Sequence, residues 1–162
     1  MGKIHLVLGP QGAGKTTYSL HLAKQEGAVR FSIDEWMQSL FGPDLPKSMS
    51  LSWMMERVLR CEKQIWAIAA QVVQSGGCVV LDLGFTKIER RKSFRDLAAD
   101  VGAEVQLHVL DAPYATRKQR VMDRNAEKGD TYSFAVTPPM FDFMEKEFQR
   151  PTQEELSVAR VV

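Results

Sequence analysis

Four residues near the start of the chain have the types and the spacing of a phosphate-binding loop. Gly9, Gly14, Lys15 and Thr16 occupy every fixed position of the P-loop pattern G-x-x-x-x-G-K-[ST]. Glycines let such a loop turn several backbone N–H groups towards one point, and the N-terminus of the following helix also favours negative charge. The lysine would reach the β and γ phosphates of a nucleotide, and the threonine hydroxyl would bind the accompanying Mg²⁺. The motif therefore predicts a site for a nucleoside triphosphate.

The residues on either side of this motif predict the strand and the helix that it requires. The run from Ile4 to Leu8 is apolar apart from His5 and rich in branched side chains, as in a buried parallel strand. The segment from Thr17 to Glu26 has apolar residues at helical spacing. The alternative is an ordinary glycine-rich turn, but the order of strand, loop and helix favours the phosphate site.

Asp34 follows a second predicted strand, at 28–32. This places it at the carboxyl edge of the sheet, where open α/β sheets bind their ligands. A carboxylate there can orient an acceptor hydroxyl and take its proton during phosphoryl transfer. Aspartate is also a favoured N-cap, so Asp34 could instead start a short helix at 35–41. The sequence leaves both hypotheses open.

Asp82 ends an apolar run that begins at Cys78, which predicts a central strand carrying a carboxylate to the same edge. In this Walker-B arrangement the aspartate holds Mg²⁺ through water, or shares the acceptor hydroxyl with Asp34. A carboxylate left unpaired beside a buried strand is costly, and a bound cation offsets that cost. We therefore expect Asp82 to belong to the metal site.

Three arginines, Arg117, Arg120 and Arg124, share one face of a later predicted helix. Like charges on one face repel each other unless an anion lies between them, and arginines suit the charge that spreads over the γ-phosphoryl oxygens. This favours a role for the three at the donor phosphates. The alternative is a solvated helix on which Asp123 and Glu127 pair with the arginines.

A second group of basic residues lies on the helix predicted after Asp82. It consists of Arg90, Arg91, Lys92 and Arg95. The pattern Thr86-x-x-Glu89 predicts a capping box at the start of this helix. A solvated face is the simpler interpretation, although a nucleic-acid substrate would use the same residues.

The remaining segments predict the elements that must hold these residues in place. A long apolar stripe predicts a helix from Ser50 or Ser52 to about Ser75, packed against the sheet. A fourth strand is expected at 104–110, and helices are expected at about 114–128 and 137–149. Gly129 to Phe134 is expected to be a flexible connector. Leu156 to Val162 is either a fifth strand or a frayed tail.

Length and composition agree with a single domain over residues 1–162. The formal net charge of +1 gives no general preference for a polyanion, so nucleic-acid binding would need a local patch. Cys61 and Cys78 are the only cysteines and lack the spacing of a metal site. No leader segment and no membrane-spanning apolar run is visible, so we expect a cytoplasmic protein without a membrane partner.

Together these motifs resemble the AAA_33 group of small P-loop kinases, relatives of polynucleotide 5'-hydroxyl kinases, zeta toxins and chloramphenicol phosphotransferases. The matching pieces are GPQGAGKTT, SIDEW around Asp34, VVLDLGF with ERR around Asp82, LDAP, RKQRVMDRN from Arg117 to Asn125, and the block from Phe134 to Glu155. The resemblance covers most of the chain. It implies an α/β fold, a three-layer P-loop NTPase sandwich whose four or five mainly parallel strands have the order 2-3-1-4-5, with a helical LID at about 117–129.

The resemblance also implies a role for each matching residue, with ATP and Mg²⁺ as cofactors. The expected catalytic residues are Lys15, Asp34, Asp82, Arg120 and Arg124. The expected nucleotide-binding residues are Gly9, Gly12, Ala13, Gly14, Lys15, Thr16, Thr17, Arg120 and Thr137, the last because relatives pack the adenine in that region. The expected metal-binding residues are Thr16 and Asp82.

Two departures from the polynucleotide kinases bear on the acceptor. Met37 stands where those enzymes usually have an arginine that grips a substrate phosphate, and Trp36 precedes it. After Asp82, Leu83-Gly84-Phe85 replaces their common Thr-Asn. Both changes favour a small, partly hydrophobic acceptor. We therefore expect an ATP- and Mg²⁺-dependent phosphotransferase that moves the γ-phosphoryl group to a hydroxyl of a small molecule.

Two other functions stay open on the sequence alone. The first is a kinase of polynucleotide 5'-hydroxyl ends, for which the basic cluster at 90–95 would bind the strand. The second is a switch protein that binds and slowly hydrolyses ATP without any acceptor. The sequence does not decide between Asp34 and Asp82 as the base, between ATP and GTP, or among oligomeric states.

Overall fold

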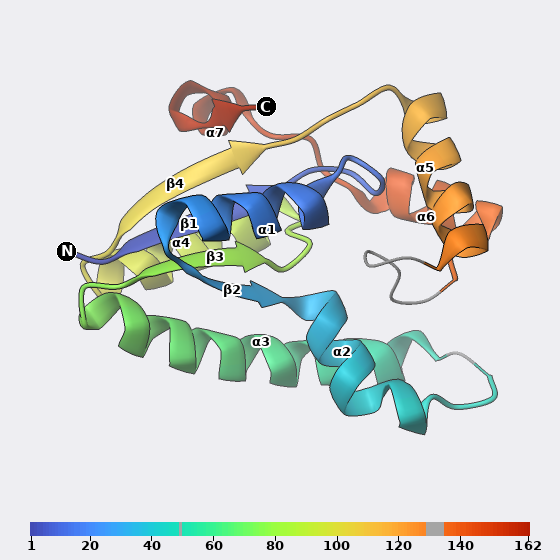
Figure 1. The fold of residues 1–162 in the computed structure, drawn as a ribbon, viewed down its shortest axis with the longest axis horizontal. Helices are drawn as coiled ribbons and strands as arrows, with labels where there is room; N and C mark the ends of the chain where they lie inside the picture. Colours follow the sequence, from blue (N-terminus) through green and yellow to red (C-terminus); the bar gives the residue numbers. More distant parts are fainter. Residues whose placement is uncertain (49, 129–134) are drawn as a thin grey trace.

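Five parallel strands form one sheet through the centre of the molecule (Figure 1). This computed structural model describes residues 1–48, 50–128 and 135–162. The strands are β1 (Lys3–Leu8), β2 (Val29–Ser32), β3 (Cys78–Asp82), β4 (Glu104–Val109) and β5 (Arg160–Val161). They lie in the order β2-β3-β1-β4-β5, and every neighbouring pair is parallel. The predicted fold class and strand order are confirmed.

The register of the strands decides which residues reach the same edge of the sheet. Ser32 lies beside Asp82, and Leu6 lies beside Leu81. The ends of β1, β2 and β3 therefore meet at one edge, and the loops that follow them leave the sheet together. Because the strand order reverses around β1, this edge is the place where open α/β sheets form a ligand crevice.

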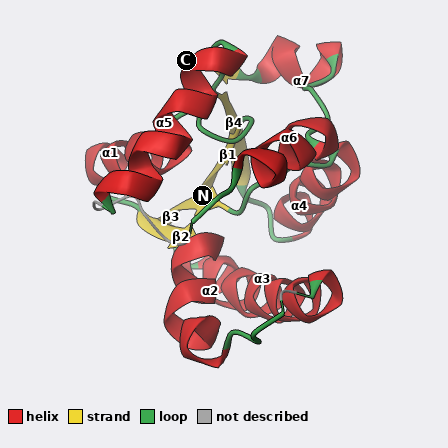
Figure 2. Ribbon diagram, turned by 90° about the vertical axis from the view of Figure 1, so that its right-hand side faces the viewer, coloured by secondary structure: helices red, strands yellow, loops and turns green. Residues whose placement is uncertain are grey.

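Helices cover both faces of the sheet (Figure 2). They are α1 (Lys15–Glu26), α2 (Ile33–Phe41), α3 (Leu51–Gln74), α4 (Ile88–Asp100), α5 (Tyr114–Glu127), α6 (Pro138–Glu147) and α7 (Gln153–Val158), with a 3-10 turn at Gly42–Asp44. In β1, Ile4, Leu6 and Leu8 pack with α3 and α4, whereas Val7 packs with α1. This alternation along a buried strand places the core on both sides of the sheet.

The long helix begins as the sequence predicts. Ser50 is the N-cap of α3, and its hydroxyl accepts a hydrogen bond from the backbone N–H of Trp53. The apolar stripe, which includes Cys61 and Ile65, faces the core under the sheet. The predicted connector from Gly129 to Phe134 lies outside the described residues.

The helix predicted to start at a Thr86/Glu89 capping box begins differently. Lys87 is the N-cap of α4 and makes no side-chain cap hydrogen bond, so the predicted capping box is wrong. The backbone N–H of Ile88 instead donates to the side-chain oxygen of Gln149, 2.8 Å away. A residue 61 positions later in the chain therefore satisfies the exposed N–H, and no local pattern could show this.

The C-terminal segment contains both a helix and a strand. Thr152 and Glu155 form a true capping box at the start of α7, a helix that the sequence interpretation missed although the same Thr-x-x-Glu pattern is present there. The question left open for Leu156 to Val162 is answered by a short fifth strand, because β5 pairs with β4.

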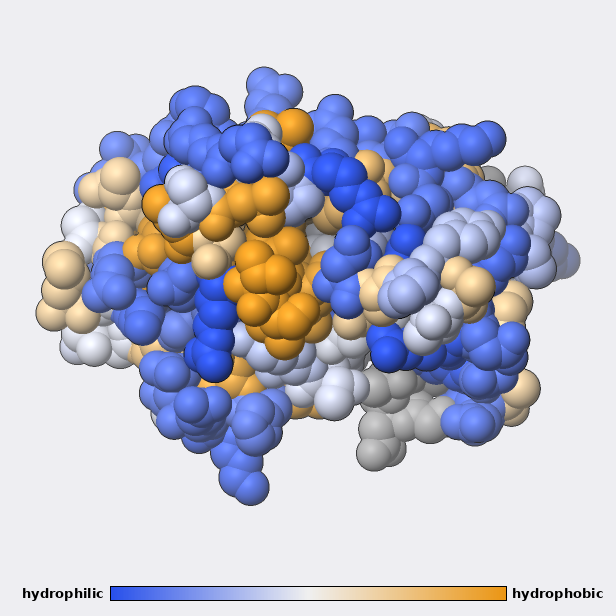
Figure 3. Space-filling model, turned by 90° about the horizontal axis from the view of Figure 1, so that it is seen from above, coloured by the Kyte–Doolittle hydropathy of each residue, from blue (hydrophilic) through white to orange (hydrophobic). Residues whose placement is uncertain are grey.

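This end of the sheet has an apolar surface. The side chains of Val158, Val161 and Val162 are all more than half exposed. Figure 3, which looks onto the top of the molecule, shows hydrophobic side chains gathered in one region of that face among hydrophilic ones. Within the described part of the chain, no helix is both long and apolar enough to cross a membrane.

Candidate functional site

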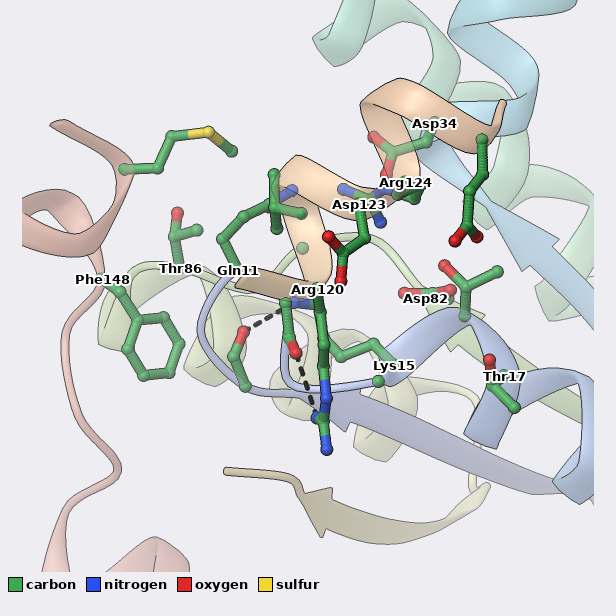
Figure 4. Close-up of a pocket in the computed structure, with 18 residues that line it drawn as sticks. Gln11, Lys15, Thr17, Asp34, Asp82, Thr86, Arg120, Asp123, Arg124 and Phe148 are labelled. Carbon is green, nitrogen blue, oxygen red and sulfur yellow. Dashed lines mark hydrogen bonds between the residues drawn. The ribbon is translucent and has the colours of Figure 1, made fainter. Parts of the chain in front are cut away.

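Most of the predicted site residues meet around one cavity of about 450 Å³ at the carboxyl edge of the sheet (Figure 4). Its lining comes from the loop after β1, the start of α2, the end of β3, and α5 and α6. It consists of Gly9, Gln11, Gly12, Gly14, Lys15, Thr16, Thr17, Asp34, Asp82, Gly84, Thr86, Arg120, Val121, Asp123, Arg124, Glu127, Met144 and Phe148. Residues from positions 9 to 148 thus enclose one space.

The glycines of the P-loop are required by close backbone contacts as well as by conformation. A Cβ added to Gly9 would lie 2.4 Å from the backbone oxygen of Leu110. One added to Gly12 would lie 2.5 Å from the backbone oxygen of Arg117, and Gly12 also has a φ of +79°. A side chain at Gly9 would push the loop away from the end of β4, and one at Gly12 would push it away from the first turn of α5.

The start of α1 has the features of an anion site. Gly14 is its N-cap, with no side-chain cap hydrogen bond and no acidic residue in the first helical turn. The Lys15 ammonium donates to the backbone oxygens of Gly9, at 2.8 Å, and Pro10, at 3.0 Å. Among the described residues it has no carboxylate at ion-pair distance. Unbonded N–H groups and an ammonium without a counter-anion together fit a phosphate chain.

Burial lowers the pKa of the Lys15 ammonium, and the charges of Asp82 and Asp34 partly reverse this effect. The net direction is downward from an ordinary value of 10.5. A bound polyphosphate would act in the same sense as the two aspartates, because negative charge nearby favours the protonated amine. The structure therefore places a cation where added negative charge is stabilising.

Asp82 is the last residue of β3, as predicted, but it is already paired. Its Oδ2 atom accepts hydrogen bonds from Ser19, at 3.0 Å, and from Arg30, at 2.9 Å. The sequence argument that this carboxylate would stay unpaired without a bound cation is wrong, because it did not include Arg30. Within the described chain no hydrogen bond reaches Oδ1, so one oxygen of Asp82 stays available on the side of the cavity.

Asp34 lies in the first turn of α2 and does not cap that helix. The cap is Ser32, whose hydroxyl accepts a hydrogen bond from the backbone N–H of Glu35 at 3.3 Å. The capping hypothesis for Asp34 is therefore wrong. Its carboxylate faces the cavity instead, together with Lys15 and Asp82.

The enclosing walls raise the pKa of the Asp34 carboxyl above 3.8, and the negative charge of Asp82 raises it further. The charges of Lys15, Arg124 and Arg30 oppose this rise. The Asp34 side chain is itself exposed to the open cavity. A carboxylate with a raised pKa is a better proton acceptor, which is what a general base requires.

The three arginines of α5 have different surroundings. Arg117 is fully buried and makes two hydrogen bonds to the Glu145 carboxylate, at 2.7 and 2.8 Å. The prediction that it faces the donor phosphates is wrong, because its guanidinium is engaged with α6 and is absent from the cavity lining. Arg120 and Arg124 do line the cavity. Arg120 donates to the backbone oxygen of Gly12 at 3.3 Å, a contact drawn in Figure 4.

The alternative ion pairs on α5 are not formed. Among the residues that the structure describes, neither Asp123 nor Glu127 is at salt-bridge distance from an arginine, and both line the cavity. Burial lowers the pKa of the Arg124 guanidinium, while the negative charge of Asp34 opposes that shift. The carboxylate of Asp34 is thus the main electrostatic neighbour of Arg124.

Two predicted nucleotide-binding residues lie outside the cavity wall. Thr137 is exposed, and its hydroxyl accepts a hydrogen bond from the backbone N–H of Met140 as the N-cap of α6. Ala13 is buried, and its N–H donates to the backbone oxygen of Pro10 at 3.2 Å. The earlier assignment of these two residues to the nucleotide therefore has no support in the lining.

The sequence interpretation missed an apolar part of the wall. Met144 and Phe148, from α6 and its C-cap, line the cavity together with Val121 of α5. By contrast, Met37 is 8% exposed and packs in the core, where its sulfur accepts a weak hydrogen bond from the thiol of Cys61. The apolar character expected from Met37 comes instead from residues more than eighty positions further along the chain.

The side chains that reach the cavity fit both predicted cofactors. Lys15 and the N-terminus of α1 present donors to phosphate oxygens. Thr16 and Asp82 present two oxygens to the same space, and Mg²⁺ takes oxygen ligands and retains several waters when it binds with a nucleotide. The oxygens of Thr16 and Asp82 and the ammonium of Lys15 thus border the same cavity.

The basic cluster of α4 is fully paired with acidic residues. Arg90 pairs with Glu62, Arg91 with Glu155, Lys92 with Asp96, and Arg95 with Glu154. Arg91 is completely buried, so the prediction of a solvated face is wrong at that position. Cations already neutralised by neighbours contribute little to binding a polyanion.

Comparison with known proteins agrees with this geometry. The profile of the AAA_33 family, described as an AAA domain, matches residues 4–151. The chain belongs to the AAA_33 family. Its sheet order and the position of the P-loop between β1 and α1 are those of a P-loop NTPase kinase fold.

Solved structures share the fold of this AAA_33 protein. Chaetomium thermophilum Kti12 in complex with ADP-AlF3 has a TM-score of 0.72 and 13% identity, over 98% of this chain and 88% of that one. A gluconokinase from Sinorhizobium meliloti has a TM-score of 0.64 and 15% identity, over 99% and 81%. A sugar kinase from Janibacter has a TM-score of 0.63 and 14% identity, over 100% and 85%. At these identities the likeness establishes the fold.

Proposed function

We propose that this protein is an ATP- and Mg²⁺-dependent phosphotransferase that moves the γ-phosphoryl group to a hydroxyl of a small molecule. The observation that carries the proposal is the convergence of Lys15, Asp34 and Asp82 on one cavity. An ammonium for the donor, an oxygen for the metal and a carboxylate for the acceptor are the groups that phosphoryl transfer needs. The kinases that share its fold support the same reaction class.

The chain's own groups can perform each part of this reaction. Lys15 and the N–H groups of α1 would bind the donor phosphates, and Thr16 and Asp82 would hold Mg²⁺. When bound, the metal would neutralise charge on the β and γ phosphates. Asp34 would accept a hydrogen bond from the acceptor hydroxyl and take its proton as the new oxygen–phosphorus bond forms and ADP leaves.

Arginines from the helical LID would complete the donor side. Arg120 and Arg124 project from α5 into the cavity and can meet the charge that spreads over the transferred group. Movement of the LID segment, residues 117–129, towards the P-loop would exclude water and so suppress hydrolysis of ATP. Arg117 would anchor the start of this segment, because its guanidinium bonds both Glu145 of α6 and the backbone oxygen of Gln11 in the P-loop.

The surroundings of the cavity favour a small acceptor over a polynucleotide. The apolar wall formed by Val121, Met144 and Phe148 suits the carbon skeleton of a small molecule. The cluster at 90–95 that motivated the polynucleotide alternative is neutralised by ion pairs. We therefore propose that the acceptor is a small molecule whose hydroxyl lies beside Asp34.

The test is a search for the acceptor. Hydroxylated metabolites, nucleosides, sugars and antibiotics are screened for accelerated release of ADP from MgATP, and product masses are measured for a gain of one phosphoryl group. Asp34→Asn should lower the acceptor-dependent rate by roughly 10²- to 10⁴-fold while leaving ADP binding in place. Asp100→Asn is the matched control, because Asp100 is exposed at the far end of α4.

The outcome also separates the proposal from the switch hypothesis. Slow hydrolysis of ATP that no hydroxyl compound accelerates would favour a nucleotide switch. Undiminished transfer by Asp34→Asn would show that another group is the base.

A further inference from the structure

Arg30, on β2, has no part in the roles assigned above, yet its guanidinium contacts three elements of the cavity. The Nε atom donates to the Ser19 hydroxyl at 2.7 Å, and Nη2 donates to Oδ2 of Asp82 at 2.9 Å. Nη1 donates to the Glu35 carboxylate at 2.6 Å. The side chain of Arg30 is only 8% exposed. One planar cation therefore joins α1, β3 and α2.

Each partner of Arg30 is adjacent to a group of the proposed reaction. Ser19 lies one helical turn after Thr16, and its hydroxyl is 3.0 Å from the backbone oxygen of Thr16. Asp82 carries the second proposed metal-binding oxygen. Glu35 follows Asp34 directly in the first turn of α2. The positions of the metal-binding groups and of the proposed base thus depend on the same guanidinium.

The two oxygens of the Asp82 carboxylate have different surroundings. Oδ2 receives both Arg30 and the buried Ser19 hydroxyl, so the carboxylate cannot rotate without breaking hydrogen bonds to both. This leaves Oδ1 without a hydrogen-bond partner among the described residues, in a side chain that lines the cavity. Partners that orient a metal-binding carboxylate are an integral part of a metal site, because they determine where its free oxygen points.

The contacts also give a chemical reason for an arginine, and not a lysine, at position 30. Three donors in one plane can bond a hydroxyl and two carboxylates at once, whereas a lysine ammonium is a single point of charge. The two carboxylates of Asp82 and Asp34 repel each other in the same cavity, and a fixed cation beside them reduces that repulsion.

We propose that Arg30 is a positioning residue that holds the Asp82 carboxylate with one oxygen free for the nucleotide-bound metal and fixes α2 relative to the P-loop. The proposal rests on the proposed donor and metal site. It assigns Arg30 no contact with the substrate. Its effect passes through Asp82 and Ser19 on the metal side, and through Glu35 on the acceptor side.

The test measures metal affinity, so it does not require a known acceptor. A fluorescent ADP analogue is first titrated without metal, and Mn²⁺ is then titrated into the ADP complex and followed by electron paramagnetic resonance. In Arg30→Met, we expect Mn²⁺ affinity to fall by roughly 10- to 100-fold, the usual effect of removing a partner that orients a metal-binding group. Metal-free ADP affinity should change less than about twofold, because Arg30 makes no hydrogen bond to Lys15 or to the N–H groups at the start of α1.

Other variants separate positioning from folding. Arg30→Lys keeps a charge beside Asp82 and should restore part of the Mn²⁺ affinity, and Ser19→Ala should lower it by a smaller factor. Glu35→Ala removes only the contact to α2 and should leave Mn²⁺ affinity unchanged. Arg60→Met is the control for loss of a surface arginine, since Arg60 is 60% exposed on α3. Melting temperatures identify any variant that fails to fold.

The result distinguishes failure of this proposal from failure of the proposed function. If the wild type binds ADP and Mn²⁺ and Arg30→Met and Arg30→Lys both bind Mn²⁺ equally well, the positioning role of Arg30 is refuted. If Asp82→Asn also binds Mn²⁺ like the wild type, the metal site itself is wrongly placed. A wild type that binds no ADP would overturn both proposals together.

Discussion

The pair of Arg91 and Glu155 makes a specific prediction about stability. Both side chains are buried, at 0% and 4% exposed, and they form two hydrogen bonds of 2.7 and 3.0 Å. The same guanidinium donates to the backbone oxygens of Phe85, Gln149 and Arg150. It therefore joins the loop after β3, which carries Thr86 into the cavity, to the segment after α6.

Substituting Glu155→Gln leaves the guanidinium of Arg91 buried without its counter-charge. Removal of one partner from a buried pair costs about 3–5 kcal/mol of unfolding free energy. In a chain of 162 residues this corresponds to a fall in melting temperature of roughly 6–20 °C. Urea unfolding at neutral pH measures the change directly.

The neighbouring residue is a matched control. Glu154 pairs with Arg95 at 3.4 Å, but its side chain is 79% exposed, so Glu154→Gln should cost less than about 1 kcal/mol. The double variant Arg91→Met with Glu155→Leu should cost less than Glu155→Gln, because it leaves no unpaired buried charge. A loss below about 1 kcal/mol for Glu155→Gln would refute the assignment of the pair as a buried ionic link.

The pH dependence of the same variant adds a second test. Burial alone would raise the pKa of Glu155, but hydrogen bonds from Arg91 and Thr152 outweigh it and hold the pKa below 4.5. The unfolded chain therefore binds the proton more readily, and the pair's stabilisation is lost as pH falls below 4.5. The stability difference between wild type and Glu155→Gln should narrow in that range.

Two further predictions concern the P-loop and a buried histidine. Gly12→Ala should weaken ADP binding at least about tenfold, because its Cβ would meet the backbone oxygen of Arg117 in a strained backbone conformation. Fluorescence titration measures this, and Gly102→Ala, strained but without a contact, should bind ADP normally. Burial lowers the pKa of His108 from 6.5 to about 4, so up to ~3 kcal/mol of stability should disappear as pH falls between those values. In His108→Gln, the free energy of unfolding measured in urea should depend less on pH over this range. An unchanged pH dependence would contradict the lowered pKa of the buried His108.

Local features of this protein were predictable because they depend on residues close together in the chain. The strand before the P-loop, the glycine loop and α1 follow one another within 24 residues, from Lys3 to Glu26. The Ser50 cap of α3 is likewise a contact over three positions. Apolar runs that end in aspartate placed Asp34 and Asp82 at one edge, since parallel strands end on the same side.

Short patterns failed where a distant residue took the place of the local partner. The Thr-x-x-Glu pattern at Thr86 forms no cap, because Gln149 bonds the start of α4 instead. The same pattern at Thr152 does form one. A pattern of four residues cannot tell these cases apart, because the outcome depends on what else packs against the backbone.

Residue types and their spacing were enough to identify the P-loop, its lysine and the two aspartates. Which charges remain free to act could be seen only once the helices and strands were packed together. Arg30 reaches Asp82 across 52 positions, Arg117 reaches Glu145 across 28, and Arg91 reaches Glu155 across 64. A buried charge must find an opposite charge or hydrogen-bond partners, and which residue supplies them depends on how the elements pack rather than on neighbours in the chain.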